Sequence, residues 1–382
     1  MDFSVSEEQA SLREGIIRFA QKELNSRVLE RDRDQTFTRD LWSKCGQMGL
    51  QGLPVPEPYG GSGLDPLSTA MALEALGYGC ADGGLVFAVC AHLFACVVPL
   101  WKHGSEEQKR RYLPGLCNGA LIGSGAMTEP GSGSDVFSLS TKAMPDGQGF
   151  RINGAKLFVS NGPVADVVIV YALTDPQKGY LGGISAFLVE KGTRGFSVGQ
   201  KFEKMGLRTA PLGELVFEDL HVSADAVIGG VGAGASLFHQ AMDWERICLF
   251  ASHIGAMERL LEKAIEHGRT RTLSGKPIGK LQAISHRIAD MKVQLEAARL
   301  LTYRAAWRLD RVKNVSLDAS MAKLFVSESL VRAALDAVQI HGGYGYMAEL
   351  GLERALRDSV ASTIYSGTSE VQRNIIARWL GL

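Results

Sequence analysis

A segment rich in glycine and serine, 126–135 (AMTEPGSGSD), carries the densest group of small polar residues in the chain. Glycine lets the backbone approach a ligand closely, so such a segment can present N–H groups and hydroxyls to a phosphate or to the edge of a flavin. The alternative is a surface turn between a helix and a strand. The spacing matches neither the dinucleotide fingerprint G-x-G-x-x-G nor a P-loop, since no P-loop lysine follows the glycines.

Four segments further along the chain combine glycine with polar residues in a similar way. They are 153–162 (NGAKLFVSNG), 204–208 (KMGLR), 339–345 (QIHGGYG) and 364–373 (IYSGTSEVQR). Together with 126–135 they resemble motifs of the acyl-CoA dehydrogenase family, in the family's order. The resemblance covers essentially the whole chain, and five motifs in one order are far more specific than any one of them.

The resemblance implies both a fold and a reaction. The fold is α+β and mostly helical: an N-terminal helical domain, a middle antiparallel β domain and a C-terminal four-helix bundle. The implied activity is that of an FAD-dependent oxidoreductase that removes two hydrogens from the α and β carbons of an acyl thioester. A base beside the α-carbon takes the proton, and the flavin accepts the hydride from the β-carbon.

Positions that match the family's flavin contacts occur in all three parts of the chain. Carried over residue by residue, they are Gly125, Met127, Thr128, Gly133 and Ser134, then Phe158, Val159 and Ser160, then Thr368, Ser369 and Glu370, and for the adenine end Arg271, Gln282, Gln339, Gly342 and Gly343. In the family a neighbouring subunit completes the adenine end, so the resemblance implies a homodimer or a homotetramer. Arg271 suits a diphosphate because its guanidinium offers fixed charged donors; its alternative is a solvated arginine at a helix end.

Two positions depart from the family pattern. Ser274, in the segment 271–278 (RTLSGKPI), stands where a phenylalanine is usual, which affects the packing of the adenine end. Ser366 stands where many members carry the catalytic glutamate, and a serine cannot act as the base near neutral pH. The backbone N–H of Ser366 can still donate to the thioester carbonyl as enolate character develops. The base must therefore come from another position.

Some branches of the family carry the glutamate on a helix of the C-terminal domain, and the segment 243–246 (DWER) resembles that branch. Glu245 falls on the matching position, and burial next to a flavin would raise its pKa, as suits a general base. The alternative is a surface glutamate at a helix start, where the helix dipole favours it. Asp243 is the rival, with a shorter side chain on another helical face. Ser134, Arg246 and Gly367 match substrate contacts, and we interpret His341 as a packing residue.

The identity of the thioester rests on three shorter segments. The text of 91–96 (AHLFAC), 244–245 and 364–368 is similar to flavoproteins that oxidise a prolyl group held on a peptidyl carrier protein. An ordinary short- or branched-chain acyl-CoA dehydrogenase and a catalytically silent flavin-binding interaction protein remain alternatives. The basic residues Lys102 and 109–111 could face an acidic carrier or form a solvated helical face. The electron acceptor is either a flavoprotein or oxygen.

The elements that must position these residues change in type along the chain. Residues 1–120 have helical patterns, with a capping box at Ser6 and Gln9 and nearly all-apolar helices over 67–77 and 85–100. Residues 121–229 contain short β-branched runs between turn residues, over 149–152, 156–159, 167–171, 184–189 and 214–217. Residues 230–382 return to long helices, predicted over 242–270, 282–312 and 317–341. This order predicts two helical layers flanking a β domain.

Composition excludes several function classes. The 382 residues include 41 basic and 41 acidic side chains, so the net charge is zero and no nucleic-acid footprint is expected. The most apolar stretch, 83–101, contains His92 and predicts a buried helix rather than a membrane span. The N-terminus lacks a signal-peptide pattern. Six cysteines without C-x-x-C spacing suit neither zinc nor a disulfide framework, and indicate free thiols in the cytoplasm.

Overall fold

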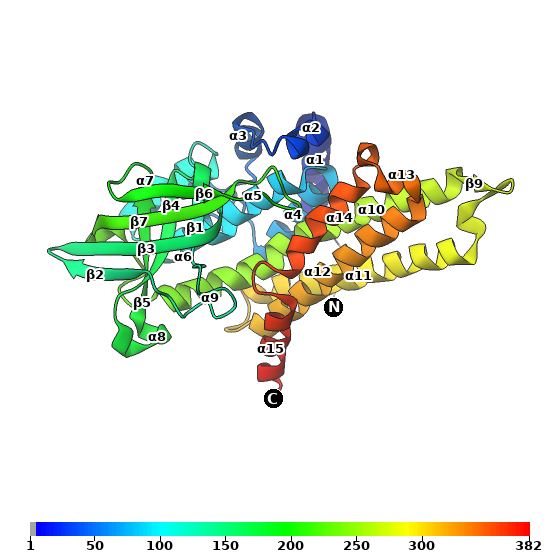
Figure 1. The fold of residues 1–382 in the computed structure, drawn as a ribbon. Helices are drawn as coiled ribbons and strands as arrows, with labels where there is room; N and C mark the ends of the chain where they lie inside the picture. Colours follow the sequence, from blue (N-terminus) through cyan, green and yellow to red (C-terminus); the bar gives the residue numbers. More distant parts are fainter. Residues whose placement is uncertain (1–4) are drawn as a thin grey trace.

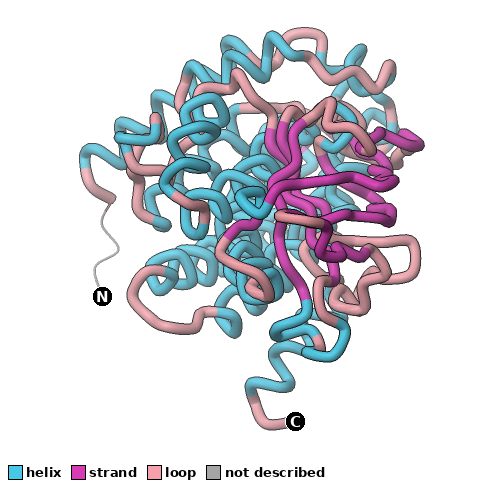
Figure 2. Tube along the Cα trace, turned by 90° about the vertical axis from the view of Figure 1, so that its left-hand side faces the viewer, coloured by secondary structure: helices cyan, strands magenta, loops and turns pink. Residues whose placement is uncertain are grey.

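The computed structural model describes residues 5–382, in which helices, then strands, then helices follow one another along the chain. The sheet occupies one end of the molecule, and the long C-terminal helices extend from it to the opposite end (Figure 1). Seen from the side, the strands gather in one part of the molecule and helices make up the rest (Figure 2). The fold is α+β and mostly helical, as the sequence predicts.

The first block contains seven α-helices in the part of it that the structure describes. They are α1 (Glu7–Glu23), α2 (Val28–Arg33), α3 (Arg39–Gln47), α4 (Pro66–Gly79), α5 (Gly83–His92), α6 (Val98–His103) and α7 (Glu106–Cys117). The predicted capping box at Ser6 and Gln9 is confirmed, and Ser105 and Gln108 form a second one at the start of α7. Capping satisfies N–H groups that have no partner within the helix, and so fixes where these helices begin.

One long apolar helical segment runs through the core. Helix α5 continues through a π-helix, η2 (Leu93–Val97), into α6. The segment Gly83–His103 is long and apolar enough to cross a membrane by length and composition, but 83% of its most apolar window is buried inside the protein. The predicted buried helix is confirmed. His92 lies inside it and accepts the Gly123 N–H at Nδ1 (2.8 Å), and burial lowers the pKa of its imidazole to about 3.

The middle block is an eight-stranded sheet in the order β6-β7-β3-β2-β4-β5-β8, with β1 beside β4. The strands are β1 (Gly123–Ala126), β2 (Lys142–Asp146), β3 (Gly149–Ser160), β4 (Val167–Leu173), β5 (Ile184–Glu190), β6 (Phe196–Lys201), β7 (Leu212–Ser223) and β8 (Val227–Ile228). Most pairs are antiparallel, whereas β1 runs parallel to β4. The predicted strands over 149–152 and 156–159 join into the single strand β3, because a bulge carries the chain past Asn153 without ending the pairing.

The third block is helical, and its α-helices range from four to 28 residues in length. They are α9 (Gly234–Trp244), α10 (Phe250–Thr270), α11 (Gln282–Leu309), α12 (Ser316–His341), α13 (Gly343–Tyr346), α14 (Leu352–Val360) and α15 (Ser369–Trp379). A second π-helix, η6 (Glu245–Leu249), joins α9 to α10, and a short hairpin of β9 (Thr272–Leu273) and β10 (Lys276–Pro277) joins α10 to α11. The hairpin lies at the end of the molecule opposite the sheet (Figure 1).

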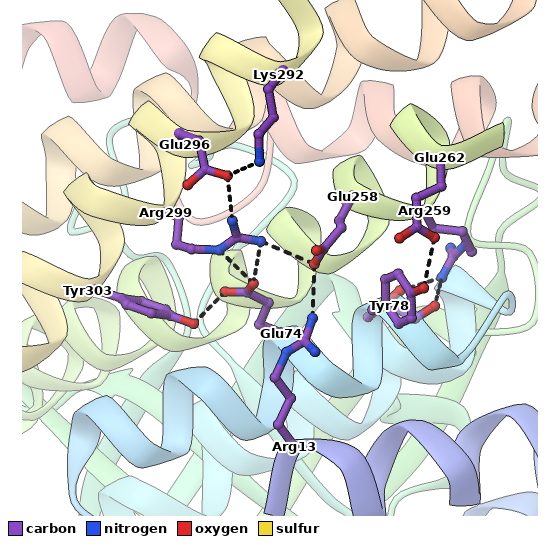
Figure 3. Close-up of polar contacts among 11 residues, drawn as sticks. Arg13, Glu74, Tyr78, Glu258, Arg259, Glu262, Lys292, Glu296, Arg299 and Tyr303 are labelled. Atoms are coloured by element: carbon purple, nitrogen blue, oxygen red, sulfur yellow. Dashed lines mark hydrogen bonds and ion pairs between the residues drawn. The ribbon is translucent and has the colours of Figure 1, made fainter. Parts of the chain in front are cut away.

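A polar network fastens the first helical block to the third (Figure 3). Glu74 of α4 accepts hydrogen bonds from Arg299 Nε (2.9 Å) and from the Tyr303 hydroxyl (2.8 Å), both on α11. Arg299 and Arg13 of α1 each reach Glu258 of α10 at 3.1 Å. Because Glu74 is buried, its pairing with Arg299 offsets the desolvation penalty of its charge. The network as a whole joins the four helices α1, α4, α10 and α11.

Candidate active site

The glycine-rich segment forms a loop after β1 that is clamped at its base and open at its tip. Lys156 Nζ on β3 lies 2.7 Å from Glu129 Oε1 and donates to the Met127 carbonyl at 2.9 Å, with both charged side chains fully buried. The Leu157 N–H donates to the Thr128 carbonyl (2.8 Å). The loop is thus fixed to the sheet, and its tip can hold a defined position.

Electrostatics keep this clamp ionised. Burial alone would raise the pKa of Glu129, but Lys156 and hydrogen bonds from Ser140 and Thr141 lower it to about 2. Burial lowers the pKa of Lys156 to about 8 although Glu129 opposes this. The sequence analysis did not predict this pair, although both residues lie inside the motifs 126–135 and 153–162. The available signal was one charged residue in each of the two motifs, with opposite signs.

The tip of the loop faces open space. A Cβ atom added to Gly131 or Gly133 would meet no atom within 4 Å. The nearby Ser132 hydroxyl is buried and has no hydrogen-bond partner among the described residues. A backbone with free space in front of it and an unpaired hydroxyl beside it suits a ligand-binding loop better than a plain surface turn.

Strand β3 turns an aromatic ring outward next to this loop. The register of β3 against β7 shifts between Lys156 and Val159, and Phe158 within the shift has φ 54°. Its ring is 56% exposed, although its centroid lies 5.2 Å from that of Phe202. A bulky residue in the left-handed region is strained, and such strain often occurs where a bulge redirects a side chain. Val159 is buried and Ser160 half-buried, so Phe158 is the exposed side chain of these three and offers an aromatic ring face.

The backbone of the loop before α15 is held in a fixed conformation. Ser366 and Gly367 have φ angles of 56° and 88°, which turn the chain sharply. The Ser366 carbonyl accepts from Arg246 Nε and from Gln372 Nε2, both at 3.1 Å. The Ser366 N–H donates to no group among residues 5–382. The loop therefore fixes its carbonyl and leaves an N–H donor available.

The three residues at the start of α15 that are predicted to contact the cofactor differ in their surroundings. Thr368 caps α15, its hydroxyl accepting the Val371 N–H at 3.3 Å, so the alternative interpretation as a helix cap is correct for its oxygen. The Ser369 hydroxyl is buried without a partner among the described residues. Glu370 is exposed.

Glu245 begins the π-helix η6 and reaches the same loop. The Ser366 hydroxyl donates to Glu245 Oε1 at 2.5 Å. Burial raises the pKa of Glu245, while the Ser366 hydrogen bond and Arg246 oppose that rise. Burial raises the pKa values of Cys90, Tyr171 and Tyr365, and the charge of Glu245 raises them further. Glu245 thus lies among apolar and weakly polar groups, not on a solvated helix start.

The rival carboxylate points elsewhere. Asp243 accepts hydrogen bonds from the Ser316 hydroxyl on α12, at 3.0 and 3.1 Å from its two oxygens. Burial raises the pKa of Asp243. Because this carboxylate is engaged by α12, its contacts are structural, whereas those of Glu245 meet the Ser366 loop.

A π-helix explains how Glu245 is positioned. One extra residue in the turn of η6 changes the direction of side chains relative to a continuous α-helix, and π-bulges are frequent at functional sites. The preceding Trp244 stacks near Phe94 of η2, with ring centroids 6.5 Å apart, and lies 6.2 Å from Trp101. The two π-helices therefore meet through aromatic rings, which fix the start of η6.

The residues assigned to the adenine end are grouped together, far from Glu245. Arg271 follows α10, Gln282 begins α11, and Gln339, Gly342 and Gly343 lie at the end of α12 or just after it. All five are exposed, and the Arg271 guanidinium carbon lies 5.9 Å from the centroid of the Tyr344 ring. This group surrounds the hairpin end of the bundle, opposite the sheet (Figure 1).

Two secondary interpretations have clear structural outcomes. His341 is buried, its Nδ1 lies 2.8 Å from the Ala337 carbonyl oxygen, and its ring stacks 4.2 Å from that of His267, as expected for a packing residue. The basic residues Lys109 and Arg110 each lie within 4 Å of Glu106, and Arg111 lies 2.6 Å from Glu190. Local acidic partners thus neutralise much of this basic cluster.

Comparison with known proteins decides the family. Residues 6–120, 124–220 and 232–381 match the N-terminal, middle and C-terminal domains of acyl-CoA dehydrogenases. The chain belongs to the acyl-CoA dehydrogenase family. As in that family, it is an oxidoreductase built from two helical domains and a middle β domain.

Several relatives of this acyl-CoA dehydrogenase family member are similar along nearly their whole length. L-prolyl-[peptidyl-carrier protein] dehydrogenase of a Serratia species is 44% identical over 100% of this chain and 99% of the relative. The same enzyme of Pseudomonas fluorescens is 48% identical over 91% of each chain. A structure of PigA with FAD and proline superimposes with a TM-score of 0.98 at 44% identity over both full chains, and butyryl-CoA dehydrogenase of Megasphaera elsdenii does so with 0.96 at 38%.

Proposed function

We propose that this protein is an FAD-dependent enzyme that dehydrogenates an acyl thioester at its α and β carbons, with Glu245 as the base. The observation that carries the proposal is the half-buried Glu245 carboxylate, 2.5 Å from the Ser366 hydroxyl, beside a loop whose Ser366 N–H has no acceptor among the described residues. A carboxylate with a raised pKa and a backbone donor close by are the two protein groups that α-proton removal requires.

The residues present fit FAD. The open glycine tip of the first loop, the exposed ring of Phe158 and the unpaired buried hydroxyls of Ser132 and Ser369 offer donors and an aromatic face. The flavin would be held by the residues assigned to it above from the loop after β1, from β3 and from the start of α15. When bound, FAD supplies the acceptor for the hydride that leaves the β-carbon.

Each protein group has a separate part in the reaction. Glu245 removes the α-proton, and the Ser366 N–H donates to the thioester carbonyl as negative charge develops there. Arg246 and Gln372 hold the Ser366 carbonyl and so fix the loop that carries the N–H. Ser134, Arg246 and Gly367 are the proposed substrate contacts. This arrangement argues against a catalytically silent protein.

The proposed substrate is a prolyl group on a peptidyl carrier protein. Two relatives named for that activity share 44% and 48% identity with this chain, whereas acyl-CoA dehydrogenases of Bacillus subtilis and Clostridium acetobutylicum share 42% and 38%. The ordinary acyl-CoA dehydrogenase function is the second candidate. The acceptor of the electrons is a flavoprotein or oxygen, and six buried free thiols support a cytoplasmic protein.

An anaerobic substrate panel tests the proposal. The holoenzyme is mixed with a prolyl-loaded peptidyl carrier, with prolyl-CoA and with butyryl-CoA, and the loss of flavin absorbance is followed. We expect the carrier-bound prolyl group to bleach the flavin fastest. Faster bleaching by butyryl-CoA would favour the ordinary dehydrogenase, and no bleaching by any thioester would contradict the enzyme assignment. Oxygen uptake during turnover then distinguishes an oxidase from a dehydrogenase.

We also propose that the functional unit is at least a dimer, with a homotetramer as a pair of dimers. The adenine-end residues lie at the hairpin end of the bundle, away from the flavin-ring residues near the sheet (Figure 1). Exposed apolar side chains accompany them, including Leu273 and Tyr344. If the hairpin end of a second copy met the flavin of this chain, its adenine-end residues would contact the cofactor and its exposed apolar side chains would be buried in the interface. We place domain boundaries near residues 120 and 229, so that the loop after β1 and strand β3 belong to the middle domain and the adenine-end residues to the C-terminal domain.

A further inference from the structure

A cavity lies outside the site described above. The end of α4 and the helices α5, α10, α12 and α14 enclose it, together with Leu207 from the loop after β6, and its volume is at most about 750 Å³ when the solvent in its open mouth is included. None of the residues assigned to the cofactor or the substrate lines it. Two wall residues contact Tyr365: the ring centroid of Phe87 lies 4.8 Å from that of Tyr365, and His253 Nε2 lies 2.5 Å from its hydroxyl. Neither Tyr365 nor Glu245 lines the cavity.

Positive charge is in excess in this cavity. Arg259, Lys263 and Arg354 line it, and Asp358 is the carboxylate among its lining residues. Asp358 already accepts the Leu207 N–H at 2.5 Å. Among the described residues, none of the three cations forms a salt bridge. The cavity therefore holds three positive charges against one negative charge.

The hydrogen bonds of these cations go to backbone carbonyls. Arg259 donates to the carbonyls at the end of α4, including Tyr78 at 2.7 Å and Cys80 at 2.9 Å. Arg354 donates to Ala81 (3.1 Å) and Lys263 to Leu350 (3.0 Å). Carbonyl dipoles compensate a charge only in part, and each side chain keeps further donors.

The cations also repel one another. Burial lowers the pKa of Lys263, and the charges of Arg259 and Arg354 lower it further. Arg354 is only 8% exposed, so its charge is poorly screened by water. An anion placed between the three side chains would relieve this repulsion and supply the missing partner.

The other walls are apolar. Val86, Phe87, Leu260, Leu330 and Leu352 line the cavity beside the charged groups. We propose that this cavity binds a compact organic anion, a carboxylate or phosphate on a body of a few carbon atoms, through Arg259, Lys263 and Arg354. The proposal does not depend on the reaction assigned to Glu245.

Calorimetric titration of the FAD-loaded protein tests the site directly. The probes are n-butyl phosphate and butyrate, with n-butanol as the neutral analogue. Both anions should bind saturably, and butanol should not; the tighter anion identifies the head group. Binding of butanol as tight as that of the anions would overturn the proposal, as would the absence of saturable binding by either anion.

Variants locate the binding. Lys263→Gln, at the open mouth, and Arg354→Gln should each weaken anion binding at least roughly tenfold, as expected for a partly desolvated charge contact. Arg354→Lys should retain most of the affinity. Lys191→Gln, an exposed lysine on the middle domain, is the control and should bind like the wild type. If Arg354→Gln is unstable, the Lys263→Gln variant alone tests the site. An unchanged affinity of Lys263→Gln for the anions would show that they bind elsewhere.

The pH dependence of anion binding is an independent test of the site. Burial raises the pKa of Asp358 to about 7, so its negative charge is lost as the pH falls below that value. His253 is neutral throughout, since burial lowers its pKa to about 3, and the neighbouring Asp32 and Asp82 are paired with Arg357 and Arg31. Butyrate, which stays ionised, should therefore bind severalfold tighter at pH 6 than at pH 8. Lys204 also faces Asp358, and burial lowers its pKa to about 8, so Lys204 and Lys263 add to this difference as they lose charge towards pH 8. Asp358→Asn should therefore reduce the difference severalfold; an undiminished difference in Asp358→Asn contradicts the role of this carboxylate in the site.

Discussion

Ser366 carries two hydrogen-bond donors with different consequences for the reaction. Its N–H has no acceptor among residues 5–382, whereas its hydroxyl donates to Glu245. The sequence suggests a part only for the backbone, and the structure adds the side chain. Because the hydroxyl stabilises the ionised carboxylate, it opposes the rise in pKa that burial causes.

This contact predicts a pH dependence. Glu245 accepts the α-proton only when ionised, so flavin reduction should rise as the pH rises through its pKa, which burial places above the ordinary value for glutamate. Ser366→Ala removes a hydrogen bond that lowers this pKa, and the rising limb should move to higher pH. The rate at high pH should change little, because alanine keeps the N–H. Anaerobic stopped-flow reduction over roughly pH 5 to 9 measures this; an unshifted limb would refute the proposed role of the hydroxyl.

At the scale of elements, the clamp between Glu129 and Lys156 joins the glycine-rich loop to β3. Glu129→Gln leaves a buried ammonium without its counter-ion, so we expect a loss of about 3–5 kcal/mol in the free energy of unfolding. Urea denaturation measures it, with the exposed Glu218→Gln as the control. The double variant Glu129→Leu/Lys156→Met should regain much of the stability, since no charge stays buried. A loss below about 1 kcal/mol would mean that the pair is solvated.

Periodicity predicts most of the helices, because an apolar face repeats regularly along an α-helix. It does not reveal η2 and η6, since one extra residue in a turn barely alters that pattern while it redirects Glu245. Strand β1 is short and rich in glycine, so it lacks the β-branched signal of β4. The left-handed conformation of Phe158 and the pairing of Glu129 with Lys156 both depend on contacts between segments, which local sequence does not encode.

Motif resemblance predicts which residues matter but not how they meet. The positions of Glu245 and Ser366 in the sequence are 121 residues apart, and only the packing of η6 against the final loop shows their contact. In the sequence, only the motif resemblance and the length and helical face of its side chain favour Glu245 over Asp243. The structure distinguishes them because Ser316 engages Asp243, while Glu245 faces Ser366.

At the scale of the whole molecule, the separation of the adenine-end residues from the flavin-ring residues predicts an assembly. Arg271→Ala should weaken both FAD retention and the oligomer, since its guanidinium lies at the exposed hairpin end. Sedimentation velocity with detection at protein and flavin wavelengths measures both at once. Arg194→Ala, on the middle domain, is the matched control. A monomeric wild-type protein that keeps FAD and full activity would contradict the shared site.

Anaerobic flavin reduction by Glu245→Gln tests the central claim most directly. Glutamine keeps the size of the side chain and can still accept the Ser366 hydrogen bond, so the variant should fold, retain FAD and bind substrate. It cannot accept the α-proton, and reduction should slow by at least roughly a hundredfold. Asp243→Asn, the control, should reduce its flavin at nearly the wild-type rate. Wild-type reduction in Glu245→Gln, together with loss of reduction in Asp243→Asn, would show that Glu245 is not the base.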